Sequence, residues 1–93
     1  MSQIEVSRTG RDRSVSRFHV RVHDDDGSGT EHDVTTTSAD LERLASGYPS
    51  PEAFVLACFG FLLERERKES ILATFDISQI ATYFPEFDRA IGR

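Results

Sequence analysis

Three histidines are the side chains best suited to bind a metal in this chain of 93 residues: His19, His23 and His32. His19 and His23 share one face of a predicted strand over residues 16–23, but four strand residues separate them by about 13 Å. Because two zinc ligands each lie about 2 Å from a shared ion, this pair cannot chelate a metal unaided. His32 has the parity of Val34 on the next strand, so it could join one of them across a hairpin. We favour the interpretation that all three are exposed strand histidines.

Residues 24–29, with the sequence DDDGSG, resemble the start of a calcium-binding loop. Positions 1, 3 and 5 of such a loop would be Asp24, Asp26 and Ser28, with a glycine at position 6 as an EF-hand requires. Position 12 is Thr35 rather than the bidentate glutamate, and the flanking patterns predict strands instead of helices. We therefore interpret residues 24–29 as a flexible, solvated hairpin tip and expect no ion at Asp24–Asp26.

Cys58 is the only thiol, and it lies in the middle of an apolar run over residues 53–63. A nucleophilic cysteine needs an electropositive, partly exposed setting, whereas phenylalanines and leucines surround this one. We expect an inert core thiol. Glu64, Glu66 and Glu69 belong to a segment of mixed charge that is typical of a solvated surface. No serine stands in a nucleophile elbow and no glycine-rich phosphate loop follows a predicted strand, so we expect no catalytic, cofactor-binding or metal residues and no enzyme activity.

The N-terminal half is predicted to form strands. Phe18, Val20 and Val22 alternate with charged residues over 16–23, as in a strand with one buried face. Residues 30–36 are rich in β-branched side chains and follow the loop at 24–29, which indicates an antiparallel hairpin. Residues 3–7 could add a third strand, whereas residues 8–16 are predicted to be a polar connector, and residues 1–13 could be flexible.

The C-terminal half is predicted to form about three helices. Thr37 or Ser38 can cap the first, which ends near residue 47. Ser50 caps the second, and Pro51 stands at its first position, so it should run over residues 51–67. The third begins with a capping-box pattern at Asp76 and ends before Pro85. Strands followed by helices indicate a single α+β domain over residues 1–93, with an N-terminal antiparallel β-hairpin or three-stranded sheet.

The second predicted helix is apolar on all sides over residues 53–63, so it must be covered on every side. Gly60 in its middle costs about 1 kcal/mol relative to alanine, and such a glycine is usually tolerated because another element lies close to it. A chain of 93 residues can cover one side of this helix easily and both sides with difficulty. We therefore expect a homodimer that self-associates through the helix at 51–67.

Charge is unevenly distributed. Residues 1–23 carry five arginines against two acids, a net +3, whereas residues 24–93 carry six basic and fourteen acidic side chains, a net −8. The acidic body disfavours nucleic acid and anionic membranes. A basic arm could still contact phosphate through Arg8, Arg11, Arg13, Arg17 and Arg21.

A helix-turn-helix over residues 70–84 is a second nucleic-acid interpretation. It would lack its recognition helix, because Pro85 follows where that helix should begin.

Location and source are inferred from composition. A single cysteine allows no intrachain disulfide, and the N-terminus lacks the pattern of a signal peptide, so we expect a cytoplasmic protein. The apolar run at 53–63 is well short of the roughly 20 residues that a membrane helix needs. Ten arginines against one lysine indicate a high-GC genome.

Four landmarks lie in the C-terminal half: FLLERE at 61–66, ESIL at 69–72, FDISQI at 75–80 and YFPEF at 83–87. Together, over residues 54–91, they resemble a group of short uncharacterised prokaryotic proteins, a resemblance that implies no function and transfers no catalytic residue. We therefore interpret the chain as a non-catalytic protein–protein interaction module. The alternative is a small regulator or nucleic-acid-associated protein that uses its arginine-rich N-terminal strand.

Overall fold

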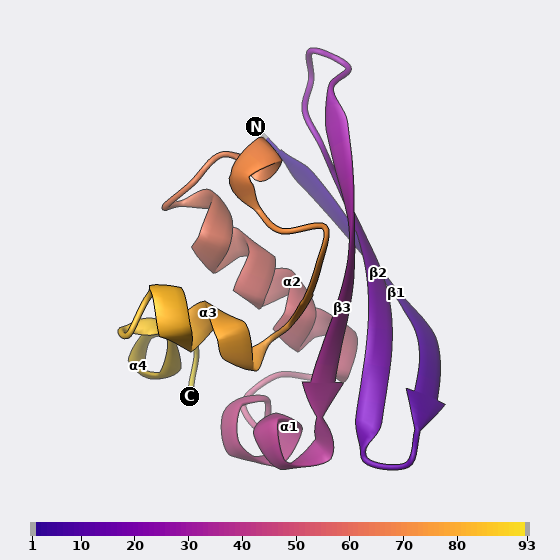
Figure 1. The fold of residues 1–93 in the computed structure, drawn as a ribbon, viewed down its shortest axis with the longest axis vertical. Coiled ribbons are helices and arrows are strands. Elements are labelled where there is room, and N and C mark those ends of the chain that lie inside the picture. The colour runs from indigo at the N-terminus through magenta and orange to yellow at the C-terminus, as the bar shows by residue number, and fades with distance from the viewer. Residues whose placement is uncertain (1, 93) are drawn as a thin grey trace.

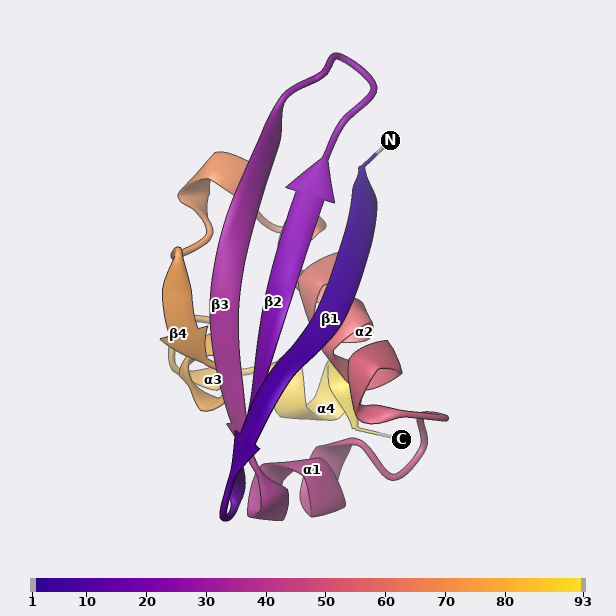
Figure 2. The same ribbon diagram turned by 90° about the vertical axis from the view of Figure 1, so that its right-hand side faces the viewer.

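A four-stranded sheet carries all the helices on one of its faces (Figures 1 and 2). The computed structural model describes residues 2–92. The sheet order is β1 (Gln3–Asp12), β2 (Val15–His23), β3 (Gly29–Thr37) and β4 (Thr74–Asp76). The first three strands are antiparallel, and β4 pairs in parallel with β3. The predicted α+β class is confirmed, and the sheet has one strand more than the three-stranded alternative.

Alternation along β2 produces the buried face of the sheet. Phe18, Val20 and Val22 are fully buried, whereas the residues between them lie on the opposite, uncovered face. The predicted polar connector over residues 8–16 is wrong, because β1 continues to Asp12 and pairs with β2 as far as Val15. Only two residues form this turn, and Arg13 takes a left-handed backbone conformation with φ of 55°. Flexibility of residues 1–13 stays a prediction, and Met1 lies outside the described residues.

Four helices follow the first three strands. The two longest, α1 and α2, lie where the first two helices are predicted. Helix α1 (Ser38–Leu44) begins with Thr37 Oγ1 accepting from the Asp40 backbone N–H at 3.1 Å. Helix α2 (Pro51–Leu63) begins with Ser50 Oγ accepting from the Ala53 N–H at 3.1 Å. Both predicted caps are confirmed.

Helix α2 ends at Leu63 and not near residue 67. The residues that follow, Glu64–Arg67, are all charged and offer no apolar side chain to the core, so nothing holds a further helical turn in place. A 3₁₀ turn, η1 (Lys68–Ser70), comes next. Helix α3 (Ser78–Tyr83) occupies most of the third predicted helix, and α4 (Phe87–Ile91) is an addition.

Both apolar sides of α2 are covered within one chain. On one side, the Phe59 ring contacts His32 of β3 and Phe75 of β4, with ring centroids 5.3 and 5.9 Å apart. On the other side, Phe61 makes edge-to-face contacts with Phe84 and Phe87. The difficulty expected in covering these two sides with one chain is therefore overcome, because the segment after η1 folds back over the helix, although Leu56 on a third side of α2 stays 46% exposed.

The core that results is assembled from the sheet, α2 and the C-terminal segments. Its fully buried side chains include Phe18, Val20, Val22, Val34, Phe54, Val55, Cys58, Phe59, Ile77 and Phe87. Among residues 2–92, none of the helices is long and apolar enough to span a membrane.

Candidate functional site

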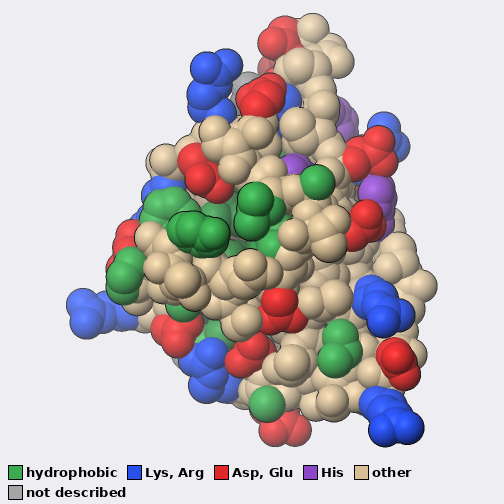
Figure 3. Space-filling model, viewed as in Figure 1, with side chains coloured by type: hydrophobic (Ala, Val, Ile, Leu, Met, Phe, Trp, Pro, Cys, Tyr) green, Lys and Arg blue, Asp and Glu red, His purple; other side chains and the backbone are tan. Residues whose placement is uncertain are grey.

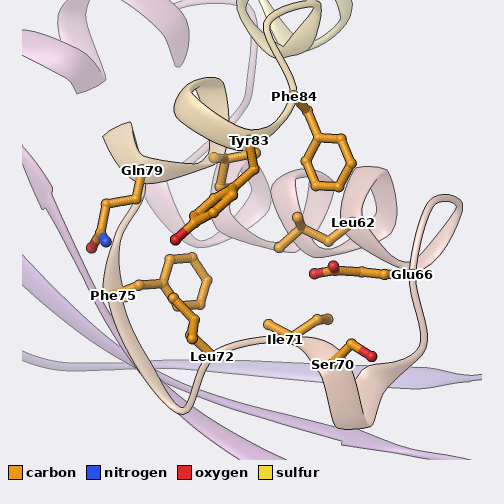
Figure 4. A pocket seen from close by; sticks show the side chains of 10 residues that line it. Leu62, Glu66, Ser70, Ile71, Leu72, Phe75, Gln79, Tyr83 and Phe84 are labelled. Atoms are coloured by element: carbon orange, nitrogen blue, oxygen red, sulfur yellow. The ribbon is translucent and has the colours of Figure 1, made fainter.

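A cleft of about 380 Å³ lies between the C-terminal end of α2, η1, β4 and α3 (Figure 4). We call it the apolar cleft. Its walls are formed mainly by Leu62, Ile71, Leu72, Phe75, Tyr83 and Phe84. Leu72 and Tyr83 stand at its rim, 49% and 66% exposed, two of the three large hydrophobic side chains that are exposed among the described residues. Figure 3 shows hydrophobic side chains gathered on this part of the surface, with acidic side chains close by.

The rim of the apolar cleft is fixed to the sheet through its backbone. His32 Nδ1 is 2.7 Å from the Leu72 carbonyl oxygen, and the Asp33 N–H donates to the Ala73 carbonyl at 2.7 Å. The other ring nitrogen of His32 is hydrogen-bonded to Thr30 Oγ1 at 2.8 Å, so both sides of this buried imidazole are satisfied. These hydrogen bonds fix the backbone of Leu72 and Ala73, at the rim of the cleft, to β3.

Glu66 places a carboxylate in the apolar cleft (Figure 4). Within residues 2–92 this carboxylate forms no hydrogen bond or ion pair, and no lysine or arginine lines the cleft. The preceding residue, Arg65, is engaged elsewhere: its guanidinium lies 3.6 Å from the Phe61 ring centroid and its Nε donates to Glu86 at 3.1 Å. The cleft therefore combines apolar walls with one uncompensated negative charge.

Helix α2 presents a second apolar surface, which we call the outward stripe. It consists of Ala53, Leu56, Ala57, Gly60 and Leu63, at helical spacing along one side of the helix, and its members Ala57 and Leu63 are partly buried against the core. Leu56 is 46% exposed and the other four are partly exposed. Apart from the helix's own backbone and the adjacent residues, no described atom lies within 4 Å of the position that a Gly60 Cβ would take. The close neighbour expected at Gly60 is thus not supplied by residues 2–92.

The histidines considered as metal ligands lie on opposite faces of the sheet. His19 and His23 are on the uncovered face, whereas His32 is 2% exposed beneath the helices. His32 therefore cannot join the other two across the hairpin, and the prediction that it is an exposed strand histidine is wrong. His32 and Val34 lie on the same face of β3, and this face packs against the core.

The two outer histidines are paired with carboxylates. His19 contacts Asp33 through Nδ1 at 2.9 Å and Glu31 through Nε2 at 2.8 Å, and His23 contacts Glu5 at 2.8 Å. The hydrogen bond to Asp33, and then that to Glu31, raise the pKa of His19. No group of three or more His, Cys, Asp or Glu side chains in the described chain is arranged to hold a metal ion.

The hairpin tip at 24–29 is anchored at one end. Asp24 accepts a hydrogen bond from Lys68 Nζ at 2.6 Å, and Asp26 accepts from the Ser28 backbone N–H and hydroxyl. The bond from Lys68 is the main cause that lowers the pKa of Asp24. These oxygens are occupied within the chain, so they are not arranged as a calcium loop. Flexibility of the tip stays a prediction.

Cys58 lies in the core as predicted, and burial raises the pKa of its thiol. An inert thiol is the chemical consequence.

The N-terminal arginines do not form one surface. Arg8 lies over the Phe18 ring, 5.7 Å from its centroid, on the helix-covered side of the sheet. Arg21 lies on the uncovered face between its cross-strand neighbours Glu5 and Glu31. Arg17, on the same face, lies between Gly10 and Thr35, so Arg21 is interleaved with acids and Arg17 is not.

Neither the apolar cleft nor Glu66 as part of a site was predicted from the sequence. The sequence contains one signal of the cleft: Tyr83 does not belong to the i, i+3, i+4, i+7 series of apolar residues in the third predicted helix, so no place in the core is predicted for it. Comparison of the chain with protein-family models, with curated proteins and with solved structures gives no match. The resemblance of residues 54–91 to short prokaryotic proteins therefore stays a prediction.

Proposed function

We propose that the protein is a non-catalytic protein–protein interaction module that self-associates as a homodimer through the outward stripe of α2. The observation that carries this proposal is Gly60. A glycine in the middle of a helix costs about 1 kcal/mol relative to alanine, and no segment of residues 2–92 outside the helix approaches it closely enough to require the missing side chain. A second copy of α2 that crosses at this position would explain why residue 60 is a glycine.

The other members of the outward stripe support the same contact. Small residues at positions 53, 57 and 60 allow two helix backbones to approach closely, and helices pack at interaxial distances of about 8–10 Å. Leu56 stands beside them with 46% of its surface exposed. Burying the rest of this side chain contributes roughly 1 kcal/mol per copy, since complete burial of a leucine contributes about 1.5–3 kcal/mol. A two-fold axis doubles this contribution by symmetry.

The non-catalytic part of the proposal is supported by the state of the ionisable side chains. The only cysteine is buried with a raised pKa, and the outer histidines are engaged by carboxylates on an open sheet face. In the apolar cleft, Glu66 is the only carboxylate, and no histidine, cysteine or lysine is among the lining residues. A general acid and base pair needs groups whose environments shift their pKa values apart, and this carboxylate has no such partner.

Sedimentation velocity across the micromolar range tests the proposal with a matched pair of variants. Leu56→Glu introduces a charge on the outward stripe, and Leu72→Glu introduces the same charge at the rim of the apolar cleft, where the parent leucine is equally exposed. We expect the wild-type protein and Leu72→Glu to be dimers and Leu56→Glu to be a folded monomer. A monomeric wild-type protein, or a dimer that only Leu72→Glu dissociates, would contradict the proposal.

A further inference from the structure

The apolar cleft has the size and composition of a binding site that the outward stripe does not use. Its volume of about 380 Å³ falls within the usual range of about 300–1,000 Å³ for preformed sites. An exposed leucine and an exposed tyrosine stand together at its rim, and tyrosine is enriched among the residues that dominate interface energies. Its backbone rim is held by His32, so the site exists before a ligand arrives.

We propose that the apolar cleft binds a segment of a different protein that presents a bulky apolar side chain next to a lysine or arginine. Charge complementarity carries the choice of a cationic segment. The Glu66 carboxylate has no counter-charge within residues 2–92, and partial burial by an apolar ligand would make it costly unless that ligand brings a cation. An acidic segment would meet like charge both at Glu66 and in the net −8 of residues 24–93.

The basic residues closest in sequence to Glu66 are committed to other acids. Arg65 is bonded to Glu86, and Lys68 is held by Asp24 and Glu69 at 2.6 and 2.9 Å. Arg67, the next residue after Glu66, is directed to Glu69 at 4.0 Å and is exposed to solvent. The hydrogen bonds from Asp24 and then Glu69 raise the pKa of Lys68, which keeps that side chain charged and paired. Glu66 is therefore left to a cation from outside.

A second copy of this chain does not offer the required segment. Among the described residues, the exposed large hydrophobic side chains are Leu56, Leu72 and Tyr83, of which the last two belong to the cleft itself. Leu56 is flanked at helical spacing by Glu52, Ala53 and Gly60, none of them basic. The occupant is consequently a different protein, and the inference does not depend on the homodimer.

Two peptides that differ only in charge test the inference: acetyl-Ala-Lys-Leu-Phe-Lys-Ala-amide and its counterpart with glutamate in place of both lysines. Each is titrated into ¹⁵N-labelled protein and followed by amide chemical shifts. We expect the lysine peptide to bind at least about tenfold more tightly than the glutamate peptide, with shifts centred on Leu72, Gln79 and Tyr83, because a charge-assisted hydrogen bond contributes about 1.5–3 kcal/mol.

Three variants separate the local charge from the overall field of the protein. Glu66→Gln should reduce the preference between the peptides to about threefold or less, since only the cleft charge is removed. Leu72→Glu should lose the apolar contact and bind neither peptide in the same place, and Leu56→Glu is the control that binds as the wild-type protein does. Shifts away from the cleft, no binding of the lysine peptide, or a preference that survives in Glu66→Gln would each overturn the inference. None of these results depends on whether the protein dimerises.

Discussion

Replacing Gly60 with alanine should change two measurable quantities in opposite directions. The position lies near the middle of α2, and no described atom outside the helix is within 4 Å of the added methyl group in a single chain. The folded monomer should therefore accept the methyl without overlap and gain the difference in helix propensity, about 1 kcal/mol. For a domain of this size, such a gain raises the melting temperature by about 4–8 °C.

Self-association should weaken in the same variant. If a second α2 crosses at Gly60, the added methyl meets the partner helix and forces the two apart. Overpacking of a close contact costs about 1–3 kcal/mol, and two copies of the methyl lie at a symmetric interface. We expect the dimer dissociation constant to rise by about tenfold or more.

The two effects are separated by concentration. Urea unfolding below the dissociation constant reports on the monomer, and sedimentation above it reports on the dimer, because dimerisation adds to apparent stability only where the dimer is populated. Gly92→Ala is the matched control, since a Cβ there would lie 2.8 Å from the Asp88 carbonyl oxygen and should destabilise the fold. A Gly60→Ala variant that is less stable as a monomer, or more stable with an unchanged dimer, would refute the reasoning.

Three further predictions concern pH, reactivity and nucleic acid. The pKa of His19 is raised above its ordinary value of 6.5, so protonated His19 stabilises the fold fully below pH 6.5, and this stabilisation is lost as pH rises through the folded-state pKa. The melting temperature of the wild-type protein relative to that of His19→Gln should therefore fall as pH increases. A difference in melting temperature that grows with pH would contradict this. Cys58 should react with a thiol reagent at the rate of global unfolding, and rapid labelling of the native protein would show that its burial is wrong. Duplex and single-stranded DNA should not bind at about 50 mM salt, because Arg21 is interleaved with acids. Salt-sensitive binding that Arg17→Ser and Arg21→Ser together abolish would instead favour the nucleic-acid alternative.

Local chemistry explains which elements could be predicted from the sequence. The alternation around Phe18 and the caps at Thr37 and Ser50 are properties of a few adjacent residues, and the structure contains each of them. Half of the capping box predicted at Asp76 is present, with its backbone N–H donating to Gln79 Oε1 at 2.8 Å, but α3 begins at Ser78 with Ile77 as its N-cap. These features need no knowledge of what lies on the other side of the core.

Other features depend on contacts between distant segments. Strand β4 has only three residues, too few for a recognisable alternation, and it exists because it pairs with β3. His32 was assigned to the surface because it is polar, yet its hydrogen bonds to Thr30 and to the Leu72 carbonyl, 40 residues away, satisfy both ring nitrogens in the core. The apolar cleft is formed by four elements, so no single stretch of sequence contains it.

The proposed contact between Leu56 of one chain and Gly60 of another can be tested directly. In an equimolar mixture of ¹³C-labelled and unlabelled protein, an isotope-filtered nuclear Overhauser experiment detects only protons that are close across an interface. We expect cross-peaks from the Leu56 methyl groups to the Gly60 and Ala57 protons of the partner copy, since these residues form the outward stripe. No intermolecular cross-peaks at concentrations well into the micromolar range, or cross-peaks confined to another surface such as the open edge of β1, would contradict self-association through α2.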